Sequence, residues 1–79
     1  EKMGENQQAL ESNRELLDKD PDYVGAYYHL GKLYQKLQQT DTAMTTFEKG
    51  IEVARKVGDQ HAKSELMGAK MELEDMLED

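Results

Sequence analysis

The sequence predicts an all-α fold of four helices that pack as antiparallel hairpins. The 79-residue chain is rich in the helix formers Glu, Lys, Leu, Met, Gln and Ala, and Pro21 is its only proline. Apolar residues recur at helical spacing in four stretches, which are separated by turns of a few residues. Residues thirty-four positions apart also match, as Ala9 and Ala43 or Leu17 and Ile51 do, and this indicates an internal repeat.

The first helix is expected from about Asn6 to Asp18, and the second from about Tyr23 to Leu37. Pro21 separates them, because proline lacks a backbone N–H and disfavours the helical conformation in the residue before it. Asp22 is then the expected N-cap of the second helix. One face of that helix carries the apolar residues Ala26, Tyr27, Leu30, Leu33, Tyr34 and Leu37.

The third helix is expected from about Asp41 to Val57, after a short turn at Gln38 and Gln39. Thr40 or Asp41 is its expected cap, since both side chains can accept a hydrogen bond from a free backbone N–H. Its apolar face carries Ala43, Met44, Phe47, Gly50, Ile51, Ala54 and Val57.

A fourth helix is expected from about Gln60 to Leu77. Gly58 can adopt the left-handed conformation that ends the third helix, and Asp59 places an acid at the start of the next. The apolar stripe of this helix consists of Ala62, Leu66, Ala69, Leu73 and Met76 or Leu77, with Met67 and Met71 beside it.

The middle of the chain resembles the tetratricopeptide repeat family. The resemblance rests on residues at the spacing of that family: Tyr27, Leu30, Gly31, Tyr34, Ala43 and Phe47. Gly31 and Ala43 are small enough for two helices to approach closely, and the larger side chains fill the space around the contact. The resemblance implies hairpins stacked as a short right-handed superhelix that binds other proteins.

The flanking segments match the family less completely. In the first segment, Gly4, Ala9 and Pro21 stand where the family has a turn glycine, a small residue and a terminal proline. An offset of thirty-seven pairs Leu30 with Met67, Gly31 with Gly68 and Tyr34 with Met71. Gln38 replaces the usual turn glycine. Gly50 replaces an alanine, which costs the third helix roughly 1 kcal/mol.

Residues 1–79 are therefore interpreted as a single domain. Residues 1–22 would be the second helix of a preceding repeat, residues 23–57 one full repeat, and residues 58–79 the first helix of a following repeat or a capping helix. The first helix would then lack its hairpin partner. We expect its residues Leu10, Leu16 and Leu17 to leave an apolar side open for homodimerisation.

The net charge of −7 is unevenly spread, with −4 over residues 1–22, +2 over residues 23–57 and −5 over residues 58–79. So acidic a chain would repel phosphates, and no nucleic-acid partner is expected. No apolar run is long enough to span a bilayer, no signal-peptide pattern is present and there is no cysteine. No membrane partner is expected, and a cytoplasmic location is the default expectation.

No catalytic residue, metal or cofactor is expected, and the chain is not expected to be an enzyme. His29 and His61 are the only histidines and fall on different helices, whereas a metal site needs three or four converging ligands. Ser12 and Ser64 do not lie in a nucleophile-elbow pattern.

The resemblance implies that the second helix lines a concave groove. Its groove-facing residues would be Gly25, Tyr28, His29, Lys32, Gln35 and Lys36. Because His29, Lys32 and Lys36 form a basic strip in an acidic chain, we expect this groove to hold a peptide or partner helix, with some preference for acidic segments. His29 and Lys32 stand where carboxylate-clamping members carry asparagines, so that clamp is not supported. The alternatives are an ordinary solvated face and a structural or oligomerisation unit of a longer solenoid.

Overall fold

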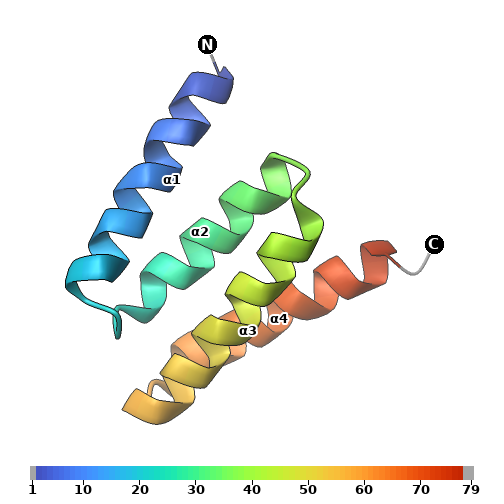
Figure 1. The fold of residues 1–79 in the computed structure, drawn as a ribbon. Helices are drawn as coiled ribbons and strands as arrows, with labels where there is room; N and C mark the ends of the chain where they lie inside the picture. Colours follow the sequence, from blue (N-terminus) through green and yellow to red (C-terminus); the bar gives the residue numbers. More distant parts are fainter. Residues whose placement is uncertain (1, 78–79) are drawn as a thin grey trace.

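The computed structural model describes residues 2–77, with side chains from Asn6 onward. In this range it contains four helices and no strand: α1 (Lys2–Lys19), α2 (Val24–Lys36), α3 (Thr40–Val57) and α4 (Gln60–Leu77). Successive helices run antiparallel, with α1 packed on α2 and α2 on α3, while α4 contacts both α3 and α2 (Figure 1). The predicted all-α fold is confirmed. None of the described helices is long and apolar enough to cross a membrane.

The first two helices begin at other residues than predicted. Helix α1 begins at Lys2 rather than Asn6, so that Gly4 lies inside a helix and not in a turn. Helix α2 begins at Val24, and its N-cap is Tyr23, which makes no side-chain cap hydrogen bond. The predicted Asp22 cap is therefore wrong. The Tyr23 N–H donates to the Asp20 carbonyl at 3.1 Å. Residues 20–23 therefore form a turn around Pro21, and the helix begins after it, at Val24.

The α2–α3 turn also differs from the prediction. Thr40 is already helical and Gln39 is the N-cap of α3, again without a side-chain hydrogen bond, so a Thr40 or Asp41 cap is wrong. The backbone makes the turn itself, since the Gln39 N–H donates to the Tyr34 carbonyl at 2.9 Å. Gln38 adopts a φ of 63°, the left-handed region that favours glycine.

The turn between α3 and α4 forms as predicted. Gly58 ends α3 in the left-handed conformation with a φ of 79°, and the Asp59 N–H donates to the Ala54 carbonyl at 2.9 Å. The Asp59 carboxylate then accepts the Ala62 N–H at 3.0 Å, which caps the start of α4. Helix α4 spans Gln60–Leu77, so its predicted bounds are confirmed. The sequence could predict its start because the Gly58 and Asp59 caps are local features.

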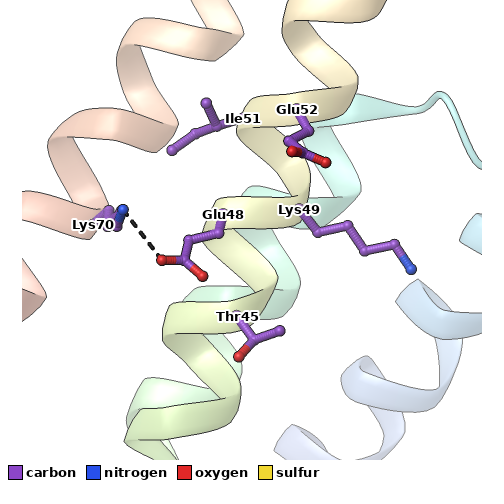
Figure 2. A pocket seen from close by; sticks show the side chains of 6 residues that line it. All are labelled: Thr45, Glu48, Lys49, Ile51, Glu52 and Lys70. Carbon is purple, nitrogen blue, oxygen red and sulfur yellow. Dashed lines mark ion pairs between the residues drawn. The ribbon is translucent and has the colours of Figure 1, made fainter.

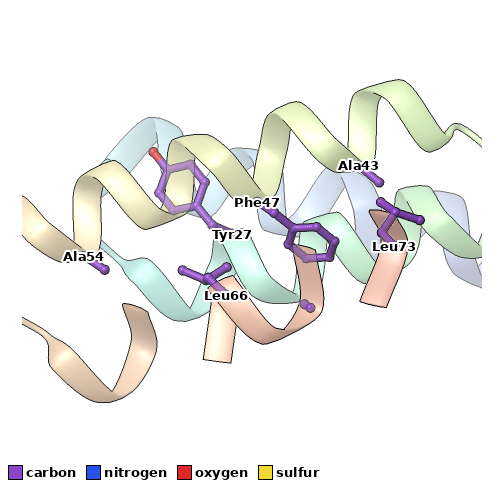
Figure 3. Close-up of a cluster of buried hydrophobic side chains, with 7 residues drawn as sticks. Tyr27, Ala43, Phe47, Ala54, Leu66 and Leu73 are labelled. Atoms are coloured by element: carbon purple, nitrogen blue, oxygen red, sulfur yellow. The ribbon is translucent and has the colours of Figure 1, made fainter. Parts of the chain in front are cut away.

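The core lies where α4 packs against the α2–α3 hairpin (Figure 3). Its members come from all three helices: Tyr27, Ala43, Phe47, Ala54, Leu66, Ala69 and Leu73. Phe47, Leu66 and Leu73 are the largest fully buried side chains. Burying each of them stabilises the fold by roughly 1.5–3 kcal/mol, so these three residues hold α4 on the hairpin.

Two glycines allow the close approach of these helices. A Cβ at Gly31 would overlap the Phe47 ring, which is itself fully buried. A Cβ at Gly50 would lie 2.7 Å from the Tyr27 Cβ and 3.0 Å from a methyl carbon of Leu66. Gly50 thus costs helix propensity but provides the space in which α2 and α4 meet α3.

The predicted apolar stripe of α4 is the one that packs: Leu66, Ala69 and Leu73 are buried in the core, Ala62 packs against it, and Leu66 lies beside Gly50. Met67 and Gly68 are exposed, whereas Leu30 and Gly31, with which the sequence pairs them, are buried. Helix α2 has α1, α3 and α4 packed around it, whereas α4 contacts only α3 and α2 within the described residues. The offset of thirty-seven therefore stays a prediction.

Candidate protein-interaction site

Three of the predicted groove residues meet in one cleft between α2 and α4. Lys32, Gln35 and Lys36 line it from α2, and Met76 lines it from α4. Its volume is about 270 Å³. The three α2 residues are brought together by helical spacing, whereas Met76 arrives because α4 packs across the hairpin. We call this the α2–α4 cleft.

The Gln35 amide links the two walls of the α2–α4 cleft. Its Nε2 donates to the Met76 sulfur at 3.5 Å, a weak hydrogen bond. Its Oε1 is buried and has no hydrogen-bond partner among the described residues. A buried acceptor without a donor costs roughly 1–3 kcal/mol.

Lys32 and Lys36 give the α2–α4 cleft a positive charge. Lys32 is half-buried and Lys36 is exposed. Neither lysine makes an ion pair with any described acid; the pairs that do form are Lys56–Asp22, His61–Glu65 and Lys70–Glu48. Among the described residues, the two ammonium groups therefore remain available to an anionic group.

Tyr28 and His29 lie on α2 but outside the lining of the α2–α4 cleft. Tyr28 is half-buried and packs against the core, with its ring centroid 6.5 Å from that of Phe47. The exposed His29 ring meets the Tyr28 ring edge-on, with centroids 6.0 Å apart. Gly25, the remaining predicted position, is half-buried beside the Tyr23 ring. Tyr28 thus has a packing role in addition to any surface role.

Lys70 belongs to a polar surface of α3 and α4. Figure 2 shows Lys70 pointing to Glu48 of α3, and the Nζ–Oε2 distance is 3.2 Å. Lys70 and Glu74, one turn apart on α4, do not form an ion pair. Lys70 is the α4 residue of this surface, and Glu48 neutralises its charge. Lys70 is therefore not available to an anionic ligand.

Within the residues that the structure describes, no group of three or more His, Cys, Asp or Glu side chains could hold a metal ion. His61 instead lies 3.6 Å from Glu65, one turn along the surface of α4. The described side chains of the α2–α4 cleft include no carboxylate, hydroxyl or thiol.

A family model described as tetratricopeptide repeat matches residues 2–67. The chain belongs to the tetratricopeptide repeat family. Repeats of this family generally mediate protein–protein interaction, and their fold is typically non-catalytic. The match spans α1, the α2–α3 hairpin and the first part of α4, so it includes most of the α2–α4 cleft but not Met76.

Two solved structures are similar to this chain over almost its whole length. One is the solution NMR structure of a tetratricopeptide repeat domain protein from Salinibacter ruber, with 51% identity and a TM-score of 0.86. The alignment covers 94% of this chain and 75% of that one. A crystal structure of a tetratricopeptide repeat domain protein from the same organism has 51% identity, a TM-score of 0.85, and coverage of 94% and 82%.

Two curated plant proteins match a shorter part of the chain. Each is described as a probable UDP-N-acetylglucosamine–peptide N-acetylglucosaminyltransferase SPINDLY, one from Oryza sativa subsp. japonica and one from Hordeum vulgare. Both are 37% identical over 46 residues, which is 58% of this chain and 5% of the relative. So small a share carries no evidence that this chain is catalytic.

Proposed function

We propose that this chain is a protein-interaction module that holds a peptide or a partner helix on its α2 face, with a preference for acidic segments. The observation that carries this proposal is the α2–α4 cleft, where Lys32 and Lys36 stand beside Gln35 and Met76 without a described acid as partner. In a chain of net charge −7, these two lysines place two positive charges at the α2–α4 cleft.

The lining of the α2–α4 cleft also suits the backbone of a bound segment. A peptide N–H that reached the Gln35 Oε1 would satisfy the buried acceptor. The Met76 side chain, which is 64% exposed, has a flexible thioether that can rearrange around an incoming group. The ligand would therefore combine an acidic side chain for the lysines with a backbone donor and an apolar contact.

Titration with labelled peptides tests this proposal. A fluorescein-labelled peptide with acidic residues should bind more tightly than a basic peptide of equal length, and its affinity should fall as salt rises because exposed charges are screened within ~8–10 Å. The double variant Lys32→Glu/Lys36→Glu should weaken binding of the acidic peptide. The matched control Lys19→Glu/Arg55→Glu makes the same change in net charge outside the cleft and should leave binding nearly unchanged.

Equal binding of acidic and basic peptides, or an unaltered affinity in the Lys32→Glu/Lys36→Glu variant, would show that the strip is only a solvated face. Circular dichroism of each variant should match that of the parent chain, since Lys36 is exposed and Lys32 half-buried. Absence of binding to nucleic acid and to lipid vesicles is the expected result of the same titrations with those ligands.

An alternative role is a structural or oligomerisation unit of a longer solenoid. The observation that favours it is the outer face of α4, where Met67 is 45% and Met71 62% exposed. The solution mass separates the two roles. A monomer that binds peptides supports the interaction module, whereas a tight dimer that prevents peptide binding supports assembly.

A further inference from the structure

A second cleft lies on the other side of α2, between α1 and α3. Its volume is about 450 Å³, within the ~300–1,000 Å³ range of ligand pockets. It exists because α1 packs on α2 and, within residues 2–77, does not contact α3. Figure 1 shows α2 lying between α1 and α3. We call this the α1–α3 cleft.

The floor of the α1–α3 cleft is apolar and aromatic. Tyr27, Leu30 and Tyr34 of α2 form it, and Leu17 adds an aliphatic side chain from α1. The Tyr27 hydroxyl already donates to the Pro21 carbonyl at 3.0 Å. With that hydroxyl occupied inside the protein, the floor would bind a ligand mainly by apolar and aromatic contact.

The hydroxyls on the α3 wall are also occupied. Thr45 and Thr46 donate to the carbonyls of Asp41 and Thr42 at 3.1 and 2.7 Å. The charged side chains of the lining are therefore the groups most available to a polar ligand.

Two cations stand on opposite walls of the α1–α3 cleft. Arg14 lines it from α1 and Lys49 from α3, and neither forms an ion pair with any described acid. Figure 2 shows the Lys49 side chain pointing away from Lys70 and towards α1. Asp18, one turn after Arg14, also lines the cleft, so its lining has a net charge of +1.

We propose that the α1–α3 cleft is a second peptide-binding site, which takes an acidic segment with one aromatic or large aliphatic residue. The apolar residue would lie on the floor of Tyr27, Leu30 and Tyr34, and a flanking carboxylate would lie between Arg14 and Lys49. An arginine can bind a carboxylate with two parallel hydrogen bonds, which favours an acid over a neutral polar residue. The charge complementarity between this cleft and an acidic partner is the basis of the assignment.

This site is independent of the proposed α2–α4 cleft. The two clefts share no lining residue, and they are lined by different sides of α2. Loss of binding at one of them therefore leaves the other available. A chain with both clefts would contact an acidic partner from two sides.

A labelled peptide Asp-Glu-Phe-Glu-Asp tests the proposal on the full 79-residue chain. The double variant Arg14→Glu/Lys49→Glu should weaken its binding by about tenfold, because two attractions become two repulsions. The control Lys19→Glu/Arg55→Glu carries the same change in net charge and should bind as the parent chain does. The peptide Asp-Glu-Gly-Glu-Asp, which lacks the aromatic residue, should bind at least about tenfold more weakly.

Backbone amide shifts locate the bound peptide. The parent chain should show its largest shifts at Arg14, Leu17, Thr45 and Lys49, and these should persist in the variant Lys32→Glu/Lys36→Glu. The variant Thr45→Tyr, which keeps every charge but fills the cleft from an exposed position, should remove them. Shifts confined to residues 32–36, or an affinity unchanged by Arg14→Glu/Lys49→Glu, would overturn the proposal.

Discussion

Gly31 and Gly68 are both in helix interiors but have opposite surroundings. A Cβ at Gly31 would overlap the buried Phe47 ring, whereas a Cβ at Gly68 would meet nothing within 4 Å. Gly31→Leu should therefore overpack the α2–α3 contact and lower the free energy of unfolding by at least about 1–3 kcal/mol. Gly68→Ala should raise it by about 0.5–1 kcal/mol, because alanine is the better helix former and no contact opposes it.

Urea denaturation of both glycine variants checks this pair of predictions. A Gly31→Leu chain with the parent midpoint would contradict the packing of α2 on α3. A destabilised Gly68→Ala chain would show instead that the outer face of α4 is covered in solution.

The raised pKa of Tyr27 predicts that the free energy of unfolding falls at alkaline pH. Burial, and to a lesser extent the nearby Asp22 charge, raise the pKa of Tyr27 above its ordinary value of 10.0. Below pH 10 both the folded and the unfolded chain keep this proton. As the pH rises above 10, the unfolded chain loses the proton first, so the free energy of unfolding falls until the folded-state pKa is passed.

The variant Tyr27→Phe should lack this part of the pH dependence. It should also lose about 0.5–1.5 kcal/mol at neutral pH, because its hydroxyl no longer donates to Pro21. Stability measured between pH 9 and 11 should decline less steeply in Tyr27→Phe than in the control Tyr23→Phe, whose ring is half exposed. If the free energy of unfolding fell equally steeply with pH in the two variants, Tyr27 would not contribute to the alkaline loss of stability.

Among the elements, the α2–α3 turn contains a residue in an unfavourable conformation. Gln38 has a φ of 63°, which costs a residue with a side chain roughly 1–2 kcal/mol and costs glycine almost nothing. Gln38→Gly should therefore stabilise the hairpin by up to about 1 kcal/mol, after allowance for the larger freedom of glycine in the unfolded chain. Thermal unfolding should show a higher Tm.

The neighbouring substitution Gln39→Gly is the control for this turn. Gln39 has a φ of −94°, where glycine relieves no strain and only loosens the unfolded chain. It should lower the Tm or leave it unchanged. An equal rise in both variants would mean that the positive φ of Gln38 is not the cause.

The helices themselves were predictable because their signals are local. Periodic apolar residues, Pro21 and Gly58 mark where they lie and where they stop. The N-caps of α2 and α3 were predicted wrongly, at Asp22 and at Thr40 or Asp41. Backbone turns, rather than hydrogen bonds from those side chains, precede the two helices. The buried face of α4 was also predictable, because Leu66, Ala69 and Leu73 recur at helical spacing and are the residues that pack.

At the scale of the whole molecule, each cleft combines residues that are distant in sequence. Helical spacing predicts that Lys32, Gln35 and Lys36 lie together, but it cannot show that Met76 faces them from forty residues further on. The α1–α3 cleft lay beyond prediction for the same reason. Arg14 and Lys49 belong to different helices and line one cleft only because both helices pack around α2.

The exposed apolar residues of the whole molecule bear on its self-association. The sequence suggests α1 as the interface, but Leu10 is only 6% exposed and Leu17 packs against the core, so Leu16 is the remaining exposed leucine of that set. Met67 and Met71 form a larger exposed apolar stripe on α4. We therefore expect any dimer to bury the methionine stripe.

Sedimentation equilibrium up to millimolar concentration measures this association, because the dimer fraction should rise with concentration by mass action. Met67→Glu/Met71→Glu removes the apolar stripe and adds two acids, so it should shift the equilibrium to monomer. The control Gln60→Glu/Ser64→Glu adds the same charge to α4 without removing apolar surface, and it should weaken the dimer much less. A strictly monomeric parent chain, or a dimer equally sensitive to both double variants, would rule out an interface at the methionine stripe.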